Sequence, residues 1–359
     1  MTVSQDSPNL DLLRSLAVLL VLFDHTVKFL GFEHWRSFDI NWMGRTGVVF
    51  FFVHTSLVLM LSLERSKLQG WPLMLNFYIR RTFRLFPLSC FFVLFTWLIG
   101  IPQSSVHPHV IYGLGITPKV LLTNLTLSQN VFGTGNILGQ LWSLPIEWNM
   151  YLLLPLLFVG ARKWPRTFLW AAWPLGALVG AFYITGVHSF PGVWRLNLLS
   201  FTPCFVPGVI AYILCRRVQP RVSAFLWPAN LLILVLVFLV RPGWPFAWII
   251  ALAVGVSAVF FKEQPNGYVN ATTHNIAKYS YGIYLGHTFC ICAAFIFLNR
   301  FPGYVEGLVF AVLIMAVPII SFTVIERPGI RVGKHIADLL TVTPVGDTLD
   351  TERVRSVTA

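Results

Sequence analysis

The chain consists mainly of apolar runs about as long as a membrane is thick, separated by short polar connections. About 20 consecutive apolar residues are needed for a helix to cross the hydrocarbon core of a bilayer. Runs of this kind cover residues 12–30, 46–63, 83–101, 138–160, 168–187, 196–214, 224–240, 246–261, 276–298 and 305–325. We therefore predict an all-α fold, a polytopic membrane helix bundle of about ten transmembrane helices.

The composition agrees with this pattern and excludes a soluble fold. Of the 359 residues, 56% are hydrophobic and 11% are charged, and the mean hydropathy is +0.71. So few charged residues cannot form the polar exterior of a soluble protein. The connections are too short for a separate soluble domain. We predict one membrane domain over residues 1–335 and a short cytoplasmic tail without fixed structure over residues 336–359.

The formal net charge of +12 raises the question of nucleic acid binding, which the positions of the cations answer. When the connections are assigned alternately to two sides of a membrane, one side holds Arg65, Lys67, Arg80, Arg81, Arg84, Arg162, Lys163, Arg166, Arg216, Arg217, Arg221, Arg327, Arg331 and Lys334. Cytoplasmic connections of membrane proteins are enriched in Lys and Arg. We therefore expect this side and both termini to be cytoplasmic, and we expect no nucleic acid partner.

The first apolar run carries an arginine and a histidine on one helical face. Arg14 and His25 are separated by eleven positions, which places them at nearly the same angle and ~16 Å apart along a helix. Polar groups at membrane depth are costly and often functional, so His25 is a candidate proton-handling group and Arg14 a candidate phosphate contact. Structural roles stay open for both, as a snorkelling anchor and as a histidine satisfied by a neighbouring helix. Asp24 points roughly 100° away and is not expected to pair with His25.

A cluster of three arginines lies at the cytoplasmic start of the third run. Arg80, Arg81 and Arg84 are spaced so that their guanidinium groups spread over one end of the helix. Forked donors at a helix N-terminus suit the phosphates of a nucleotide-like ligand. The alternative is a positive-inside anchor with no ligand.

A carboxylate begins the run near residue 147. Glu147 follows Ser143 and Pro145 and precedes Trp148, and a strongly apolar stretch comes after it. Pro145 favours a helix start or a kink just before the carboxylate. A charge at this depth needs a partner, so Glu147 is either catalytic, in contact with substrate, or part of a structural salt bridge.

Two further histidines lie inside apolar runs. In the ninth run, Ser280, Tyr284 and His287 share one helical face, which fits a binding site or an interhelical hydrogen-bond seam equally well. His54 lies at mid-depth in the second run, beside two hydroxyl residues, and the same two explanations apply to it.

The cysteines give no sign of a metal site. Cys90, Cys204, Cys215, Cys290 and Cys292 show no ligand-like spacing apart from one Cys-x-Cys pair inside an apolar run. We expect them to act as small packing residues and predict neither a disulfide nor a bound metal.

These motifs together resemble the integral-membrane acyltransferase 3 family, whose members are similar to the O-acetylases of O-antigens and exopolysaccharides. The motifs that carry the resemblance occur in family order at Leu10–Arg14, His25, Gly47–Val53, Phe77–Pro87, Leu141–Trp148, Ser280–His287 and Ile325–Pro328. The resemblance spans about residues 9–330. The Arg-x10-His spacing and the Arg-x-x-Arg pair are fairly specific only in combination.

The resemblance implies acyl transfer from a cytoplasmic acyl-CoA, expected to be acetyl-CoA, to a hydroxyl of a glycan or lipid-linked sugar across the bilayer. It implies no permanently bound cofactor and a place in the bacterial cytoplasmic (inner) membrane. The family's essential histidine and acidic residue fall on His25 and Glu147, which we take as catalytic candidates. Its paired arginine and Arg-x-x-Arg fall on Arg14, Arg81 and Arg84, which with Arg80 are the expected donor-binding residues. Candidates for the acceptor or pocket are Asp24, His54, Ser143, Trp148, Tyr284 and His287.

One departure from the family pattern lies in the second run. Many relatives carry Leu-Ser-Gly where this chain has His54, Thr55 and Ser56, which leaves the acceptor open. The main alternative function is a transporter or flippase of lipid-linked glycans. Transporters often show repeated halves with matching broken helices, and no such repeat is visible in this sequence.

Overall fold

The computed structural model describes residues 7–32, 34–35, 38–99, 116–186, 193–265 and 267–341, and almost all regular structure in them is helical. The longer helices are α1 (Pro8–Phe29), α2 (Asn41–Arg65), α3 (Gly70–Ile99), α6 (Leu144–Lys163), α7 (Pro165–Ile184), α8 (Thr202–Cys215), α9 (Leu226–Val240), α10 (Trp244–Ala258), α11 (Tyr268–Phe295), α12 (Gly303–Ser321) and α13 (Arg327–Thr341). The shorter ones are α4 (Pro118–Leu125), α5 (Gln129–Phe132), η2 (Gly139–Trp142), η4 (Val193–Phe201) and η5 (Phe322–Glu326). Two short strands, β1 (His34–Trp35) and β2 (Phe38–Asp39), pair in antiparallel fashion.

The all-α prediction is confirmed, and each of the ten predicted runs overlaps a helix. Six helical stretches of the described chain are long and apolar enough to cross a membrane, while α9 and α10 are apolar but shorter. The pattern did not predict α4, α5 or α13. The last of these continues α12 through the π-helical η5 and runs past residue 335 to Thr341. Residues 342–359 lie outside the described part of the chain.

Helix α1 begins where local chemistry favours a start. The Ser7 hydroxyl accepts a hydrogen bond from the backbone N–H of Leu10, and Pro8 occupies the first turn, where its missing N–H costs nothing. Its buried positions include Leu13, Ala17 and Val21, spaced four residues apart along one face. That face packs against α2 and α11.

Glycines allow α2 to approach α1 closely. A Cβ on Gly44 would lie 2.6 Å from Asp24 Oδ2, and a Cβ on Gly47 would lie 2.9 Å from Val21 Cγ2. Small residues at such crossings let the two backbones pack tightly inside a membrane. The pair α1–α2 therefore forms a close-packed unit that carries both Arg14 and His25.

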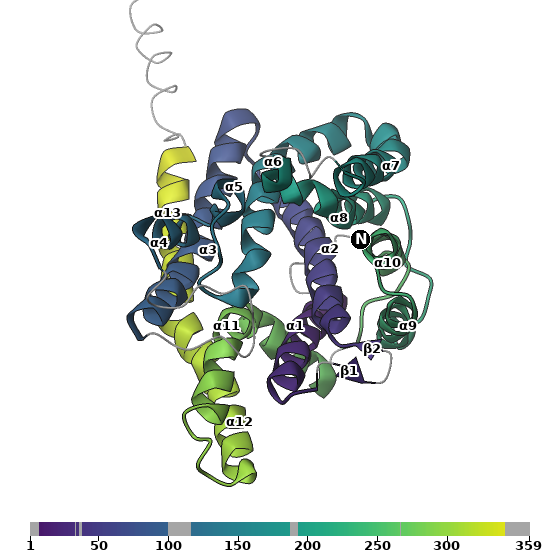
Figure 1. The fold of residues 1–359 in the computed structure, drawn as a ribbon. Coiled ribbons are helices and arrows are strands. Elements are labelled where there is room, and N and C mark those ends of the chain that lie inside the picture. The colour runs from purple at the N-terminus through teal and green to yellow at the C-terminus, as the bar shows by residue number, and fades with distance from the viewer. Residues whose placement is uncertain are drawn as a thin grey trace, which may run out of the picture.

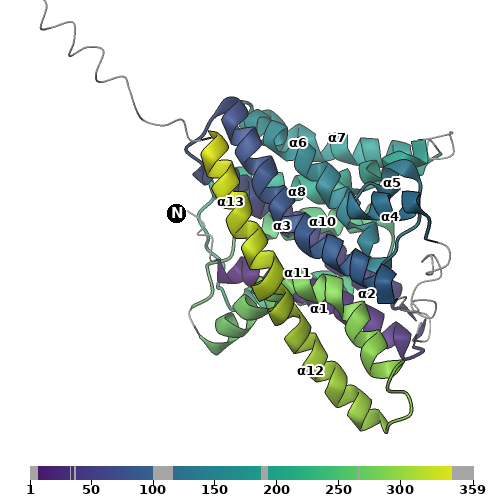
Figure 2. The same cartoon turned by 90° about the vertical axis from the view of Figure 1, so that its left-hand side faces the viewer.

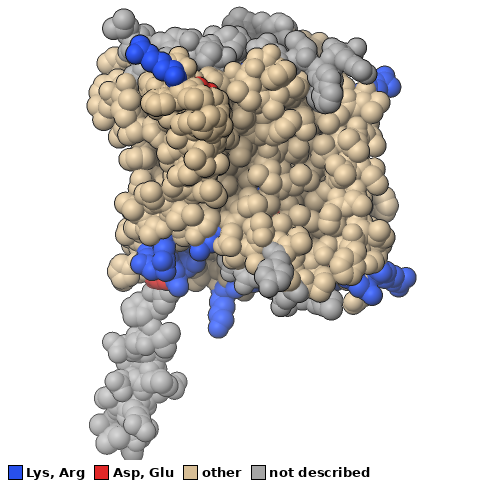
Figure 3. All heavy atoms as spheres, turned by 90° about the horizontal axis from the view of Figure 1, so that it is seen from below, with Lys and Arg blue, Asp and Glu red and all other residues tan. Residues whose placement is uncertain are grey.

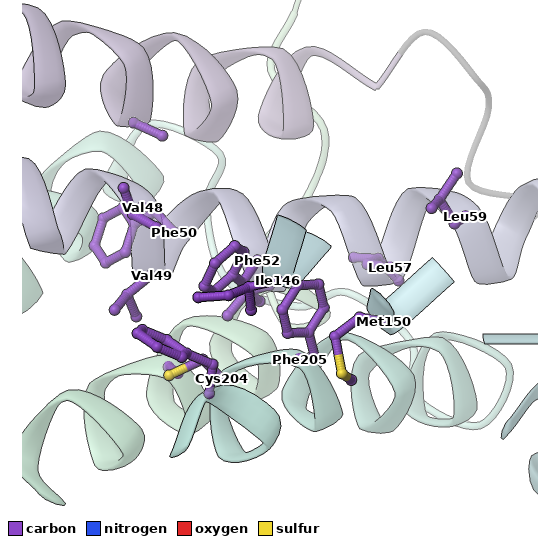
Figure 4. Packing of buried hydrophobic residues seen from close by; sticks show 14 of the residues in the cluster. Val48, Val49, Phe50, Phe52, Leu57, Leu59, Ile146, Met150, Cys204 and Phe205 are labelled. Atoms are coloured by element: carbon purple, nitrogen blue, oxygen red, sulfur yellow. The ribbon is translucent and has the colours of Figure 1, made fainter. Parts of the chain in front are cut away.

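The apolar core lies on the side of α2 that faces away from α1. Figure 4 shows Phe52 of α2 lying against Phe205 of α8, with Ile146 of α6 beside them. The rings of Phe52 and Phe205 are stacked with centroids 4.3 Å apart. Gly208 of α8 faces α2 so closely that a Cβ there would lie 2.6 Å from the Leu57 backbone nitrogen. Helix α2 is thus central to the bundle (Figure 1).

Helix α13 lies alongside α3, and α12 packs mainly against α11 (Figures 1 and 2). A glycine also permits the close contact between α13 and α3, because a Cβ on Gly329 would lie 3.0 Å from the Phe83 backbone oxygen. The hydroxyl of Thr341 accepts a hydrogen bond of 2.9 Å from the Asn76 side chain. The end of α13 therefore lies beside the start of α3.

The charges are segregated as in a membrane protein. On the face shown in Figure 3, Lys and Arg side chains lie at the two opposite edges, and the broad band between them shows no charged side chain. The basic connections lie together at one of these edges. Lys67 and Lys334 line one hollow there, and Arg216 forms an ion pair with Glu64. Ser7 lines a second hollow together with Arg216. The start of α1 and the end of α13 therefore lie on the same side.

The tight α2–α8 contact yields a stability prediction. Gly208→Ala should destabilise the protein by about 1–3 kcal/mol, because the added methyl group overlaps atoms of Val53, Ser56 and Leu57. Thermal unfolding in detergent measures the change. Gly307→Ala on α12 is the matched control, since no atom lies within 4 Å of the place its methyl group would take and alanine favours a helix. Equal melting temperatures for the two variants would contradict the packing argument.

Candidate active site

A small polar cavity lies between α1, α2, α3, α6 and α11. Its volume is about 80 Å³. The polar side chains that line it are Arg14, His54, Thr55, Arg81, Arg84, Ser143, Glu147, Tyr151, Ser280, Tyr281 and Tyr284. Apolar walls are supplied mainly by Val48, Phe51, Phe52, Val58 and Leu59 of α2. We call this space the inner cavity.

Arg14 enters the inner cavity from α1 and is fixed by α11. Its Nε donates a hydrogen bond of 2.6 Å to Ser280 Oγ. The Ser280 hydroxyl is fully buried and donates in turn to the Ala277 carbonyl, 2.7 Å away. This arrangement is not that of a snorkelling anchor. It holds the guanidinium inside the bundle, where an isolated charge would be costly.

Glu147 is the acidic residue of the inner cavity. Helix α6 begins at Leu144 with Pro145 in its first turn, which places the Glu147 carboxylate near the positive end of the helix dipole. One turn later, the Tyr151 hydroxyl donates a hydrogen bond to Glu147 Oε1. Arg14 and Arg81 line the same cavity, so the carboxylate is surrounded by cations and hydroxyls.

A larger hollow opens at the basic edge of the bundle, with a volume of about 610 Å³. We call it the basic groove. The charged residues that line it are Arg65, Lys67, Arg80, Arg81, Arg84, Lys334 and Asp338. Arg81 and Arg84 line both the basic groove and the inner cavity. These two arginines therefore lie where the two spaces border each other.

The three arginines of α3 differ in their partners. Arg84 pairs with the buried Glu326, and Arg80 pairs with Asp338 of α13 at 2.7 Å on the surface. No carboxylate among the described residues lies within ion-pair distance of Arg81, whose guanidinium lies over the Phe77 ring at 5.9 Å. Arg81 is thus the guanidinium of this cluster with the least protein competition for an anionic ligand.

His25 does not line the inner cavity. Its Nδ1 donates a hydrogen bond of 2.8 Å to the Val21 carbonyl, and its ring contacts the His287 ring with centroids 4.7 Å apart. The expectation that Asp24 does not pair with His25 is wrong, because Asp24 Oδ2 lies 3.5 Å from His25 Nδ1. Nδ1 is the ring nitrogen nearer to the backbone, so an adjacent carboxylate can reach it. The same oxygen binds Lys28 at 2.7 Å.

His287 and Tyr284 lie one turn apart on α11 and have different roles. Tyr284 belongs to a seam between helices, since its hydroxyl donates to the Gln140 carbonyl at 2.7 Å and receives a hydrogen bond of 2.6 Å from Ser143. His287 Nδ1 donates to the Ile283 carbonyl at 3.2 Å. Its Nε2 is buried without a partner among the described residues. An unsatisfied buried acceptor costs about 1–3 kcal/mol.

The remaining two candidates lie in different surroundings. His54 lines the inner cavity and is 4% exposed, and its Nδ1 has no hydrogen-bond partner in the described part of the chain. Trp148 does not line the cavity. Its ring packs edge-on against Phe86, with centroids 5.1 Å apart. Asp24 is likewise absent from the cavity wall and forms the ion pair with Lys28.

Residues 7–327 match the family model of acyltransferase 3, described as an acyltransferase domain. The chain belongs to the acyltransferase 3 family. Comparison with curated proteins gave no significant match, and comparison with solved structures gave none either. With its long apolar helices, the protein is therefore a membrane acyltransferase.

The structure of the acyltransferase gathers most of the sequence candidates into two groups. Those in the inner cavity are Arg14, His54, Arg81, Arg84, Ser143, Glu147 and Tyr284, while Arg80 lines only the basic groove. His25 and His287 form a separate pair, which we call the histidine pair. Along α1, His25 lies about 16 Å beyond Arg14, so the pair is at the opposite end of the helix from the basic groove.

Two residues that bind candidate site residues of the acyltransferase were not among the sequence candidates themselves. Tyr151 was missed although it lies one helical turn after Glu147, a spacing that could have suggested the contact. Glu326 was missed as the partner of Arg84 because the two are far apart in sequence. In the described residues, no group of three or more His, Cys, Asp or Glu side chains could hold a metal.

The two ion pairs beside the basic groove give a matched comparison. Glu326→Gln should destabilise the acyltransferase by about 3–5 kcal/mol, because it leaves the half-buried Arg84 without its carboxylate. Asp338→Asn should cost at most about 1 kcal/mol, because its pair with Arg80 is about 40% exposed on both sides. Chemical denaturation in detergent measures both. Equal losses would show that burial does not set the strength of these pairs.

Proposed function

We propose that this membrane acyltransferase moves an acetyl group from cytoplasmic acetyl-CoA to a hydroxyl of a glycan or lipid-linked sugar on the other side of the membrane. One observation carries the proposal: Arg81 and Arg84 line both an open basic groove and a buried polar cavity. A donor with a charged head and a thin reactive arm fits such a pair of spaces. The bilayer separates the two substrates.

The basic groove would hold the phosphates of the donor. Its volume of about 610 Å³ lies in the usual range for ligand pockets. Planar guanidinium groups bind phosphate oxygens in pairs, and Arg81 has no competing carboxylate within ion-pair distance among the described residues. Arg80 is engaged by Asp338, so its contribution requires that this surface pair opens or shares the arginine.

The distribution of cations gives the proposed orientation. The groove lies on the side that carries most Lys and Arg residues of the connections, and such sides face the cytoplasm. We accordingly propose ten transmembrane helices, cytoplasmic termini and the bacterial inner membrane as the location. The donor then enters from the cytoplasm, and the histidine pair faces the extracytoplasmic half.

The small inner cavity favours a short acyl group. A volume of about 80 Å³ leaves room for few atoms, and Phe51, Val58 and Leu59 form its apolar walls. A longer acyl chain would have to displace these side chains. Arg14 and Arg81 would donate hydrogen bonds to polar groups of the donor as its arm enters this cavity.

In the proposed reaction, the acceptor oxygen forms a bond to the acyl carbon and the carbon–sulfur bond breaks. His25 takes the proton from the acceptor hydroxyl and returns it to the sulfur of the leaving CoA. Glu147 accepts the hydrogen bond of Tyr151 and balances the positive charge of Arg14, which lines the same cavity. The Tyr284 ring lines the inner cavity, meets the Phe51 ring edge-on with centroids 6.1 Å apart and lies 6.3 Å from the His287 ring, so it must turn aside for the thioester to reach His25.

Incubation of the purified protein with radiolabelled acetyl-CoA and membrane glycans tests the function. An acyltransferase of this kind places label in a product that alkali releases, because the new bond is an ester. A transporter of lipid-linked glycans leaves the glycans unlabelled. Absence of label with wild-type protein over a range of glycan acceptors would refute the proposal.

Arg81→Gln should raise the KM for acetyl-CoA at least tenfold, because it removes charge-assisted hydrogen bonds to the phosphates. The KM for the glycan should stay the same. Arg166→Gln is the control, because Arg166 is exposed at the start of α7 and lines neither space. If Arg81→Gln leaves the donor KM unchanged, the groove is only a topological anchor.

His25→Asn should lower kcat by about 100-fold or more, the usual contribution of a general base. The asparagine amide can still donate to the Val21 carbonyl, so the fold should be kept. Binding of acetyl-CoA, measured by calorimetry, should not change. Wild-type turnover in this variant would remove His25 from the chemistry.

A further inference from the structure

The Tyr284 hydroxyl is held by two hydrogen bonds from the segment that precedes α6. Its single hydrogen goes to the Gln140 carbonyl oxygen, 2.7 Å away, because a carbonyl oxygen can only accept. The Ser143 hydroxyl, 2.6 Å from the same phenol oxygen, must then donate to it. Gln140 lies in η2, Ser143 follows it directly, and all three side chains are buried. The ring of Tyr284 is therefore fixed at its tip as well as at its helix.

The segment that binds the Tyr284 hydroxyl is itself attached to α11. The Gln140 amide nitrogen donates a hydrogen bond of 2.9 Å to the Leu285 carbonyl, and its amide oxygen accepts one of 2.9 Å from the Thr288 hydroxyl. Both of these partners are fully buried. The Gln140 carbonyl therefore stays in place when the Tyr284 ring turns, so that turning the ring breaks both hydrogen bonds of its hydroxyl.

These hydrogen bonds hold the ring between the inner cavity and the histidine pair. On one side Tyr284 lines the cavity, and on the other its ring centroid lies 6.3 Å from that of His287. The Phe51 ring meets it edge-on in the cavity wall. Loss of one buried hydrogen bond shifts an equilibrium by about 10- to 100-fold. The position that separates the cavity from His25 is thus strongly favoured at rest.

We propose that Tyr284 controls whether acetyl-CoA is consumed by transfer or by hydrolysis, an inference that rests on the proposed function. While its hydroxyl is bound, a thioester in the inner cavity does not reach His25. Closed sites of this kind protect reactive groups from water. The ring has to turn for either reaction, so the two hydrogen bonds keep the thioester from the base for most of the time.

The reaction that Tyr284 suppresses is simple. A water molecule on the acceptor side would attack the acyl carbon with an oxygen lone pair, and the carbon–sulfur bond would break with its electron pair on the sulfur. His25 would take one proton from the water and give it to that sulfur. The products are acetic acid and CoA, and no other reactant is needed.

Two substitutions weaken the contact to different degrees. Tyr284→Phe keeps the ring and removes both hydrogen bonds, whereas Ser143→Ala removes only one and leaves the bond to the Gln140 carbonyl. Tyr212→Phe is the matched control. Its ring is 1% exposed and its hydroxyl is bound to Glu64, but it lies on α8 and lines neither the inner cavity nor the basic groove.

The experiment measures release of CoA from acetyl-CoA by the purified full-length protein in detergent, without any glycan. We expect Tyr284→Phe to raise this rate about 10- to 100-fold, Ser143→Ala to raise it less, and Tyr212→Phe to leave it unchanged. The KM for acetyl-CoA should stay the same in all three variants. Partial unfolding lowers activity, so a gain of hydrolysis does not follow from mere loss of stability, which the melting temperature reports separately.

A double variant tests the route of the gained hydrolysis. Adding His25→Asn to Tyr284→Phe should return CoA release to the wild-type rate, because the water then lacks its base. Persistent hydrolysis in the double variant would mean that water attacks within the inner cavity, which would overturn the inference.

The remaining outcomes separate this inference from the proposed function. If the wild-type protein transfers no label from acetyl-CoA to glycans, the proposed function fails, and this inference fails with it. If wild-type protein transfers label and Tyr284→Phe hydrolyses acetyl-CoA no faster than wild type, only the role of Tyr284 is refuted. An equal gain of hydrolysis in Tyr212→Phe also refutes it, because general loosening of the bundle would then explain the effect.

Discussion

The cost of a charge inside an apolar helix bundle governs the interior of this acyltransferase. Arg14 and Glu147 are placed on different helices, yet both line one small cavity where each has polar neighbours. Arg84 reaches Glu326 in the same region. Removing any one of these charged side chains leaves another buried charge without a partner. The polar groups of the cavity therefore stabilise the bundle only when all of them are present. The helices α1, α3, α6 and α11 are held together by that requirement.

The same constraint separates the protein into two polar regions. The inner cavity borders the basic groove at Arg81 and Arg84, whereas His25 and His287 meet farther along α1 and α11. Between them lies a layer that includes the hydrogen bonds of Tyr284. In the function proposed above, this layer would keep the donor apart from the acceptor until the thioester crosses it.

Helix α13 shows how a polar segment can shape a site. It continues α12, lies against α3 and contributes Lys334 and Asp338 to the basic groove (Figure 2). Its start is fixed by Glu326, which is buried at the end of η5 and bound to Arg84. The groove that we assign to the donor is therefore formed jointly by the third helix and the C-terminal part of the chain.

The sequence by itself determined the helical runs, the basic edge and the roles open to Arg81, Arg84 and Glu147, because run length, charge and helical spacing are local properties. It did not predict α13, whose polar residues break the apolar pattern used to find membrane helices. Only the tertiary structure decided that His25 faces His287 and that Arg14 lies with Glu147. Spacing fixes the face of a residue on its own helix, whereas the packing of the helices chooses the neighbour that this face meets.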